Sequence, residues 1–169
     1  MVIRMKITDP ELARLAVRVG KALLRSERSA ATAESCTGGW IAKAMTDIAG
    51  SSQWFIEGFV TYSNESKIRR LGVPTSVLNA HGAVSEPAAR AMALGALRRS
   101  GAQVAVAVTG IAGPDGAVPG KPVGTVWLAW AVKRAAKVHV TADHKRFSGD
   151  REAVRRKTVQ AALAGLLKR

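Results

Sequence analysis

The feature that most constrains the fold is a continuous apolar run, VAVAV at residues 104–108, which leads directly into a long glycine-rich segment, TGIAGPDGAVPGKP at 109–122. An uninterrupted apolar strand is typical of a sheet that is covered by helices on both faces. A long loop between two apolar segments is more often functional than a plain connection. The run therefore predicts an interior strand that ends at a functional loop.

Helical and strand patterns alternate along the rest of the chain. Thr8 and Glu11 stand at capping-box spacing before the first helical pattern, and consecutive strands late in the chain imply at least one antiparallel pair. Helices are expected at 9–26, 40–49, 65–71, 76–81, 86–100 and from about 150 onward, and strands at 30–33, 54–63, 104–108, 123–132 and 137–144. This order predicts an α/β fold, a three-layer α/β/α sandwich with a mixed, mostly parallel central sheet, in a single domain over residues 1–169.

Composition limits the compartment and the membrane partners that we expect. Hydrophobic residues make up 47% of the chain and charged residues 22%, which is the usage of a globular protein. No apolar run reaches the ~20 residues that a membrane-spanning helix needs. The beginning of the chain, MVIRMKITDP, lacks the apolar segment of a secretory signal. Cys36 is the only cysteine and allows no internal disulfide, so we expect a cytoplasmic protein without a membrane partner.

The formal net charge of +14, from 26 Lys and Arg against 12 Asp and Glu, raises the question of an anionic partner. The basic residues are scattered, with no basic tail and no aromatic-rich binding strand. A solvated basic surface is therefore the favoured interpretation, and nucleic acid is a rival partner that the sequence does not favour.

The segment AESCTGGW at 33–40 places three possible nucleophiles, Ser35, Cys36 and Thr37, where a strand ends and a helix begins. The free N–H groups and the positive helix end beside the Ser35 hydroxyl suit an oxyanion hole. The alternative is that Ser35 or Thr37 only caps the following helix. Cys36 is the rival nucleophile, but a buried inert thiol is favoured because no spacing links it to any histidine, namely His81, His139 or His144.

A serine nucleophile without histidine needs another base, and Lys67 is the candidate if burial lowers its pKa. Tyr62 could relay a proton or orient that lysine. The alternative is an exposed lysine and a tyrosine with a solvated hydroxyl. Arg151, expected in the first turn of the last helix, would be stabilised there by a bound phosphate or by the neighbouring Asp150.

Two other kinds of site involve the glycine-rich loop and the histidines. The loop 109–122 lacks the GK[ST] ending of a Walker loop but could form a backbone nest for a phosphate or polar ligand, or be an ordinary turn-rich connection. His139 and His144 would point to opposite faces of a strand, so no metal site is expected.

Six blocks, in order along nearly the whole chain, resemble the CinA C-terminal domain family. They are AESCTGG (33–39), FVTYSNESK (59–67), GAVSEPAARAMA (82–93), VAVTGIAGPDG (106–116), KPVGTVWLA (121–129) and FSGDREAVRRKT (147–158). The resemblance implies an amidase that hydrolyses the carboxamide of nicotinamide mononucleotide to nicotinic acid mononucleotide and ammonia. It implies no cofactor and no metal, and it implies a homo-oligomer.

The resemblance also implies residue roles. Ser35 would be the nucleophile, Lys67 and Tyr62 its activating partners, and Arg151 a catalytic or phosphate-binding residue. The expected substrate-binding residues are Cys36, Thr37, Gly38, Gly39, Thr109, Gly110, Ala112 and Gly113. Two rival functions are a non-catalytic nucleotide-binding module and a basic, nucleic-acid-associated protein linked to competence or DNA damage. The presence of Ser35, Tyr62 and Lys67 together favours the enzyme.

Overall fold

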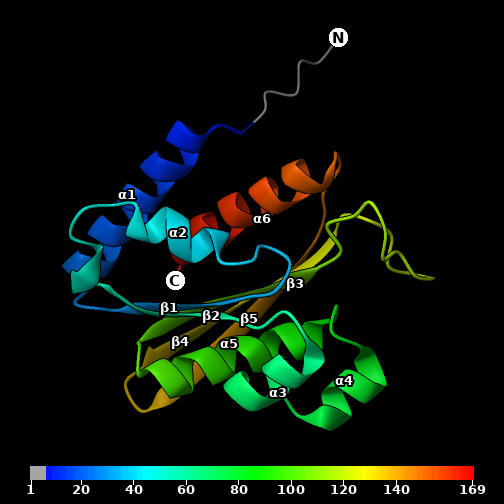
Figure 1. The fold of residues 1–169 in the computed structure, drawn as a ribbon. Helices are drawn as coiled ribbons and strands as arrows, with labels where there is room; N and C mark the ends of the chain where they lie inside the picture. The colour runs from blue at the N-terminus through cyan, green and yellow to red at the C-terminus, as the bar shows by residue number, and fades with distance from the viewer. Residues whose placement is uncertain (1–6) are drawn as a thin grey trace.

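The computed structural model describes residues 7–169, in which a five-stranded sheet lies between two layers of helices (Figure 1). β1 pairs in parallel with β2 and β3, and β4 is antiparallel to β3 and β5. Four strands therefore run in one direction and β4 alone runs against them, which confirms the mixed, mostly parallel sheet. The strands, in sheet order, are β2 (Phe55–Val60), β1 (Ala30–Glu34), β3 (Val104–Gly110), β4 (Thr125–Arg134) and β5 (Lys137–Arg146).

The helices divide between the two faces of the sheet, as Figure 1 shows. One face carries α1 (Asp9–Arg25), α2 (Trp40–Thr46) and α6 (Arg151–Leu166). The other carries α3 (Asn64–Leu71), α4 (Thr75–His81) and α5 (Glu86–Ser100). A single 3-10 turn, η1 (Ser51–Gln53), leads into β2. The three-layer sandwich expected from the sequence is confirmed.

The interior strand β3 separates two hydrophobic cores. Its valines, Val104, Val106 and Val108, join the core beneath α1, α2 and α6, and its alanines, Ala105 and Ala107, join the core beneath α5. All five side chains are fully or almost fully buried. Small side chains on the second face let α5 approach the sheet closely, which explains both the VAVAV pattern and the alanine-rich helix.

Helix α5 in turn sets the position of α3 through Gly95. A Cβ atom on Gly95 would lie 2.0 Å from the carbonyl oxygen of Leu71, the last residue of α3. The two helices are therefore in backbone contact at this point, where no side chain fits. This contact matters for function because α3 carries Lys67.

The second helix is shorter than the sequence predicts, ending at Thr46 and not near Gly50. The Thr46 hydroxyl donates to the carbonyl oxygens of Ala42 and Lys43, at 2.8 and 3.2 Å. The last helical bond runs from the Asp47 N–H to the Lys43 carbonyl oxygen at 2.8 Å, and the Ile48 N–H then bonds the Met45 carbonyl oxygen, three residues back, at 3.4 Å. Gly50 then adopts a left-handed conformation before η1, so the chain turns before it enters β2.

No helix among residues 7–169 is long and apolar enough to cross a membrane. The segment MVIRMK, on which the expectation of a missing secretory signal partly depends, lies outside the described residues.

Candidate active site

The candidate site lies where the carboxyl ends of the three parallel strands meet. The Ser35 N–H, just beyond β1, donates to the carbonyl oxygen of Val108 in β3 at 3.1 Å. The Thr61 N–H, just beyond β2, donates to the carbonyl oxygen of Glu34 at 2.9 Å. These bonds hold the three strand ends at one edge of the sheet, the usual ligand position in an open α/β sheet.

A cavity of about 270 Å³ opens at this edge. Most of the predicted site residues line it, and they come from the segments that follow β1 and β2, from α3, from the end of β3 and the loop after it, and from α6. Those residues are Ser35, Cys36, Tyr62, Lys67, Thr109, Gly110, Ala112, Gly113 and Arg151. Ala83, Val84 and Asp115 also line the cavity and were not predicted from the sequence.

Lys67 is almost completely buried, with 1% of its surface exposed, and its amine contacts the candidate nucleophile. Nζ lies 3.1 Å from Ser35 Oγ, and it donates to the carbonyl oxygens of Thr61 at 2.8 Å and Tyr62 at 3.0 Å. No carboxylate within residues 7–169 bonds this amine. Burial lowers the pKa of Lys67 below the ordinary 10.5 because the charged form loses its hydration.

The three contacts of Nζ define what a neutral amine would do there. A neutral amine has two N–H groups and one lone pair. When the N–H groups donate to the two carbonyl oxygens, the lone pair is left facing Ser35 Oγ. This arrangement suits removal of the serine proton, provided that Lys67 is deprotonated.

The Tyr62 side chain takes another direction. Its backbone carbonyl accepts from Lys67, whereas the residue as a whole is 63% exposed and its hydroxyl accepts from Arg151 Nη2 at 3.3 Å. Arg151 Nη1 donates to the Gly113 carbonyl oxygen at 2.8 Å. In the described chain the Tyr62 hydroxyl makes no hydrogen bond to Lys67 or Ser35. A proton relay through this hydroxyl stays a prediction, while orientation of Lys67 by Tyr62 uses its backbone.

The rival nucleophile, Cys36, lies in the wall of the same cavity but is buried, with 6% of its surface exposed. Burial raises the pKa of the Cys36 thiol to about 12. The thiolate needed for nucleophilic attack is therefore scarce at neutral pH. The electrostatics favour Ser35 over Cys36.

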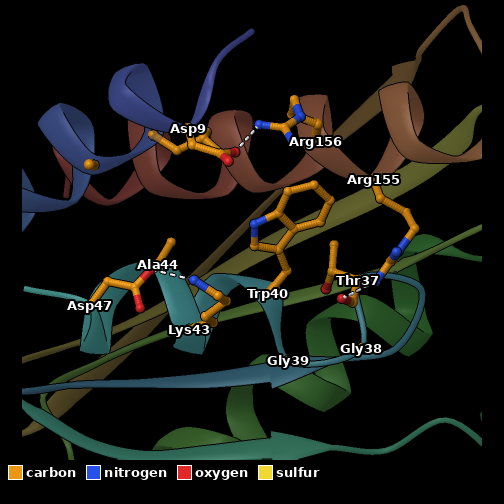
Figure 2. A pocket seen from close by; sticks show the side chains of 12 residues that line it. Asp9, Thr37, Gly38, Gly39, Trp40, Lys43, Ala44, Asp47, Arg155 and Arg156 are labelled. Carbon is orange, nitrogen blue, oxygen red and sulfur yellow. Dashed lines mark hydrogen bonds and ion pairs between the residues drawn. The ribbon is translucent and has the colours of Figure 1, made fainter.

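Thr37, Gly38 and Gly39 do not line the Ser35 cavity. They lie against a second cavity, of about 480 Å³, on the side of α1, α2 and α6 (Figure 2). The Gly38 N–H is already used, because it donates to the Ser35 carbonyl oxygen at 3.1 Å. The Cys36 N–H makes no hydrogen bond to another residue of the described chain, which leaves it as the candidate oxyanion donor of this turn.

Thr109 connects the end of β3 to the segment before α5. Its side chain is 1% exposed, and its hydroxyl donates to the Ala83 carbonyl oxygen at 2.8 Å. The hydroxyl proton is thereby committed, so toward the cavity Thr109 can only accept hydrogen bonds.

Sequence reasoning missed Glu34, the last residue of β1. Its fully buried carboxylate accepts from the Thr37 hydroxyl at 2.6 Å and from the N–H groups of Ile41 and Ala42 at 2.8 and 2.9 Å. It therefore caps α2, whose own N-cap position is Gly39 and has no side chain to do so. The available signal was an acidic residue at the end of an otherwise small, buried strand.

Arg155 was missed as well. It follows Arg151 by one helical turn on α6, and its guanidinium donates to the carbonyl oxygens of Cys36 and Thr37. The available signal was the spacing of four residues, which places both arginines on one side of the helix. Separately, residues 7–169 contain no cluster of three His, Cys, Asp or Glu side chains that could hold a metal ion.

Comparison with known proteins identifies relatives of this fold and site. The chain is 53% identical over 160 residues to "Nicotinamide-nucleotide amidohydrolase PncC" of Escherichia coli (strain K12), covering 95% of each chain. It is 55% identical over 159 residues to the protein of the same name from Pseudomonas putida, covering 94% of this chain and 96% of that one.

A solved structure and a family model agree with this. The crystal structure of competence/damage inducible protein CihA from Agrobacterium tumefaciens matches with a TM-score of 0.89 and 44% identity, over 99% of this chain and 100% of that one. The family model of the CinA C-terminal domain matches residues 12–169. The chain therefore belongs to the CinA C-terminal domain family.

Proposed function

We propose that this protein is a nicotinamide-nucleotide amidohydrolase that converts nicotinamide mononucleotide to nicotinic acid mononucleotide and ammonia. The observation that carries the proposal is the buried amine of Lys67, 3.1 Å from Ser35 Oγ and without a carboxylate partner in the described chain. The names of relatives at 53% and 55% identity support the amide substrate. The open cavity at Ser35 provides the space for it.

In the proposed mechanism, neutral Lys67 takes the proton of Ser35 as Oγ attacks the carboxamide carbon. The tetrahedral intermediate collapses when its C–N bond breaks, and the proton held by Lys67 passes to the departing nitrogen, which leaves as ammonia. Water then attacks the acyl-serine ester with Lys67 again as base. The C–O bond to Ser35 breaks, the acid is released, and Ser35 regains its proton.

The negative charge of the tetrahedral intermediate develops near the turn after Ser35. The Cys36 N–H is the donor we assign to it, by analogy with turns in which the residue after the nucleophile supplies this group. One such donor contributes about 3 kcal/mol to transition-state stabilisation in comparable sites. Arg151, at the cavity wall, is the cation we assign to the substrate phosphate.

The test is ammonia release from nicotinamide mononucleotide by purified protein, with nicotinamide riboside as the matched substrate that lacks the phosphate. We expect turnover of the nucleotide, and a lower kcat/KM for the riboside because it cannot use Arg151. Nucleotide binding without ammonia would favour the non-catalytic module instead. Absence of both, together with salt-sensitive binding to DNA, would favour the nucleic-acid alternative.

A further inference from the structure

Arg155 connects α6 to the turn that carries the candidate nucleophile. Figure 2 shows its side chain extending past Trp40 toward Thr37. Nε donates to the Cys36 carbonyl oxygen at 3.1 Å and Nη2 to the Thr37 carbonyl oxygen at 3.0 Å. The guanidinium carbon lies 5.4 Å from the centre of the Trp40 ring, a cation–π distance. Arg155 is thus held between a tryptophan face and two consecutive backbone carbonyls.

These two bonds orient the peptide units of the turn. In a planar trans peptide the carbonyl and the N–H point in opposite directions. Because the Thr37 carbonyl points to Arg155, the N–H of Gly38 points away from it, and this N–H donates to the Ser35 carbonyl oxygen at 3.1 Å. That bond fixes the Ser35–Cys36 peptide, and with it the direction of the Cys36 N–H.

We infer that Arg155 is a positioning residue. By holding the carbonyls of Cys36 and Thr37, it keeps the Cys36 N–H aligned with the oxyanion of the tetrahedral intermediate, which is the former carboxamide oxygen of the substrate. The inference depends on the proposed function, and it adds a role outside the substrate cavity, which Arg155 does not line. An arginine suits this task because its planar guanidinium holds two donors in a fixed relative direction, whereas a lysine ammonium is a point charge on a flexible stem.

The first test removes the guanidinium and then supplies it from solution. Arg155→Ala should lower kcat for nicotinamide mononucleotide about 100-fold and leave KM nearly unchanged, since misplacement by about 1 Å costs that much. The 480 Å³ cavity beside Gly38 and Trp40 provides a path for free guanidinium ion to the vacated place. Millimolar guanidinium should therefore raise kcat of the variant about tenfold, and Arg155→Lys should remain impaired.

The matched control is Arg156→Ala. Arg156 also lies over the Trp40 ring, at 4.8 Å, but its hydrogen bonds go to Asp9 and Glu152 and not to the turn. This variant should keep its kcat and should not respond to guanidinium. Thermal unfolding of every variant shows whether the fold has been lost. Guanidinium rescue is a second criterion, because a variant that is only destabilised gains no activity from a denaturing ion.

A second readout does not need the substrate. A fluorophosphonate forms a bond between phosphorus and Ser35 Oγ, fluoride leaves, and the serine proton passes to Lys67; intact mass reports the rate. Arg155→Ala should react about 100-fold more slowly than the parent. An unchanged rate in this variant overturns the inference, as does a rise in KM alone. If the parent protein releases no ammonia, the proposed function fails, and the labelling rates still decide the role of Arg155.

Discussion

Lys67 Nζ lies 3.1 Å from Ser35 Oγ, and its other two hydrogen bonds go to backbone carbonyl oxygens. The two residues are far apart in sequence and meet because β1 and β2 are neighbouring parallel strands. Burial favours the neutral amine, which is the form that accepts a proton. The pair therefore combines a nucleophile with a base without the use of histidine.

Replacement of Ser35 by Ala should reduce ammonia release from nicotinamide mononucleotide by roughly 10⁴-fold or more, because the attacking oxygen is lost. Nucleotide binding, measured by calorimetry, should be retained. Cys36→Ala is the matched control at the neighbouring position and should keep most of its activity, since its thiol is not ionised. If Cys36→Ala were inactive and Ser35→Ala active, the nucleophile would be Cys36 and the assignment of Ser35 would be wrong.

The pH dependence of kcat/KM should show an acid limb caused by Lys67. Activity should rise with pH as the amine loses its proton, and the midpoint should lie below the ordinary lysine pKa of 10.5. Cys36→Ala should show the same limb, because the thiol has a pKa of about 12. A limb that disappears in Cys36→Ala would assign it to the thiol.

Tyr62→Phe distinguishes the backbone role of this residue from the relay predicted from the sequence. If only the backbone carbonyl of Tyr62 matters to Lys67, the variant loses one exposed hydrogen bond to Arg151. Transition-state stabilisation then falls by at most about 1 kcal/mol, which lowers kcat/KM about fivefold. Participation of the hydroxyl in proton transfer would cost about 100-fold or more. Steady-state kinetics of the variant therefore decide between the two roles.

Gly95→Ala should lower both stability and activity. The added Cβ would meet the Leu71 carbonyl oxygen at 2.0 Å and displace α3, which carries Lys67. We expect a loss of about 1–3 kcal/mol in the free energy of unfolding, which outweighs the ~1 kcal/mol that alanine gains in a helix. Urea unfolding and kcat measure the two effects.

Gly101→Ala is the control for that variant. Gly101 has a φ of +72°, and no atom lies within 4 Å of the place that an added methyl group would occupy. The substitution therefore adds only backbone strain of about 1–2 kcal/mol. Its kcat should match the parent. Equal kcat in Gly95→Ala and the parent would show that the α3–α5 contact does not control Lys67.

The secondary structure was predictable where its signals are local. Four helices begin where their capping residues predict, because each cap bonds a group only a few residues away. These caps are the capping box of Thr8 and Glu11 and the side chains of Ser63, Ser85 and Asp150. The end of α2 was missed because no glycine or proline stands between Thr46 and Gly50, whereas the chain already leaves helical pairing at Ile48, whose N–H bonds Met45 three residues back.

The residue types of the site were predictable from the sequence, but the directions in which their side chains point were not. Thr37, Gly38 and Gly39 stand beside Ser35 in sequence, yet they face another cavity because Arg155 and Glu34 hold the turn from distant or buried positions. The Tyr62 hydroxyl likewise bonds a residue distant in sequence, Arg151 of α6, whose position depends on the whole fold. Local spacing cannot specify such contacts.

The burial of Lys67 has a consequence for how reactivity arises in this chain. In the unfolded polypeptide its amine is an ordinary solvated ammonium and Ser35 an ordinary alcohol. Only the folded chain, in which α3 packs on α5 and Lys67 reaches the segment that follows β2, gives the amine its lowered pKa and its place beside the hydroxyl. Folding and activation of the nucleophile are therefore one event, because the burial that lowers the pKa of Lys67 exists only in the folded chain.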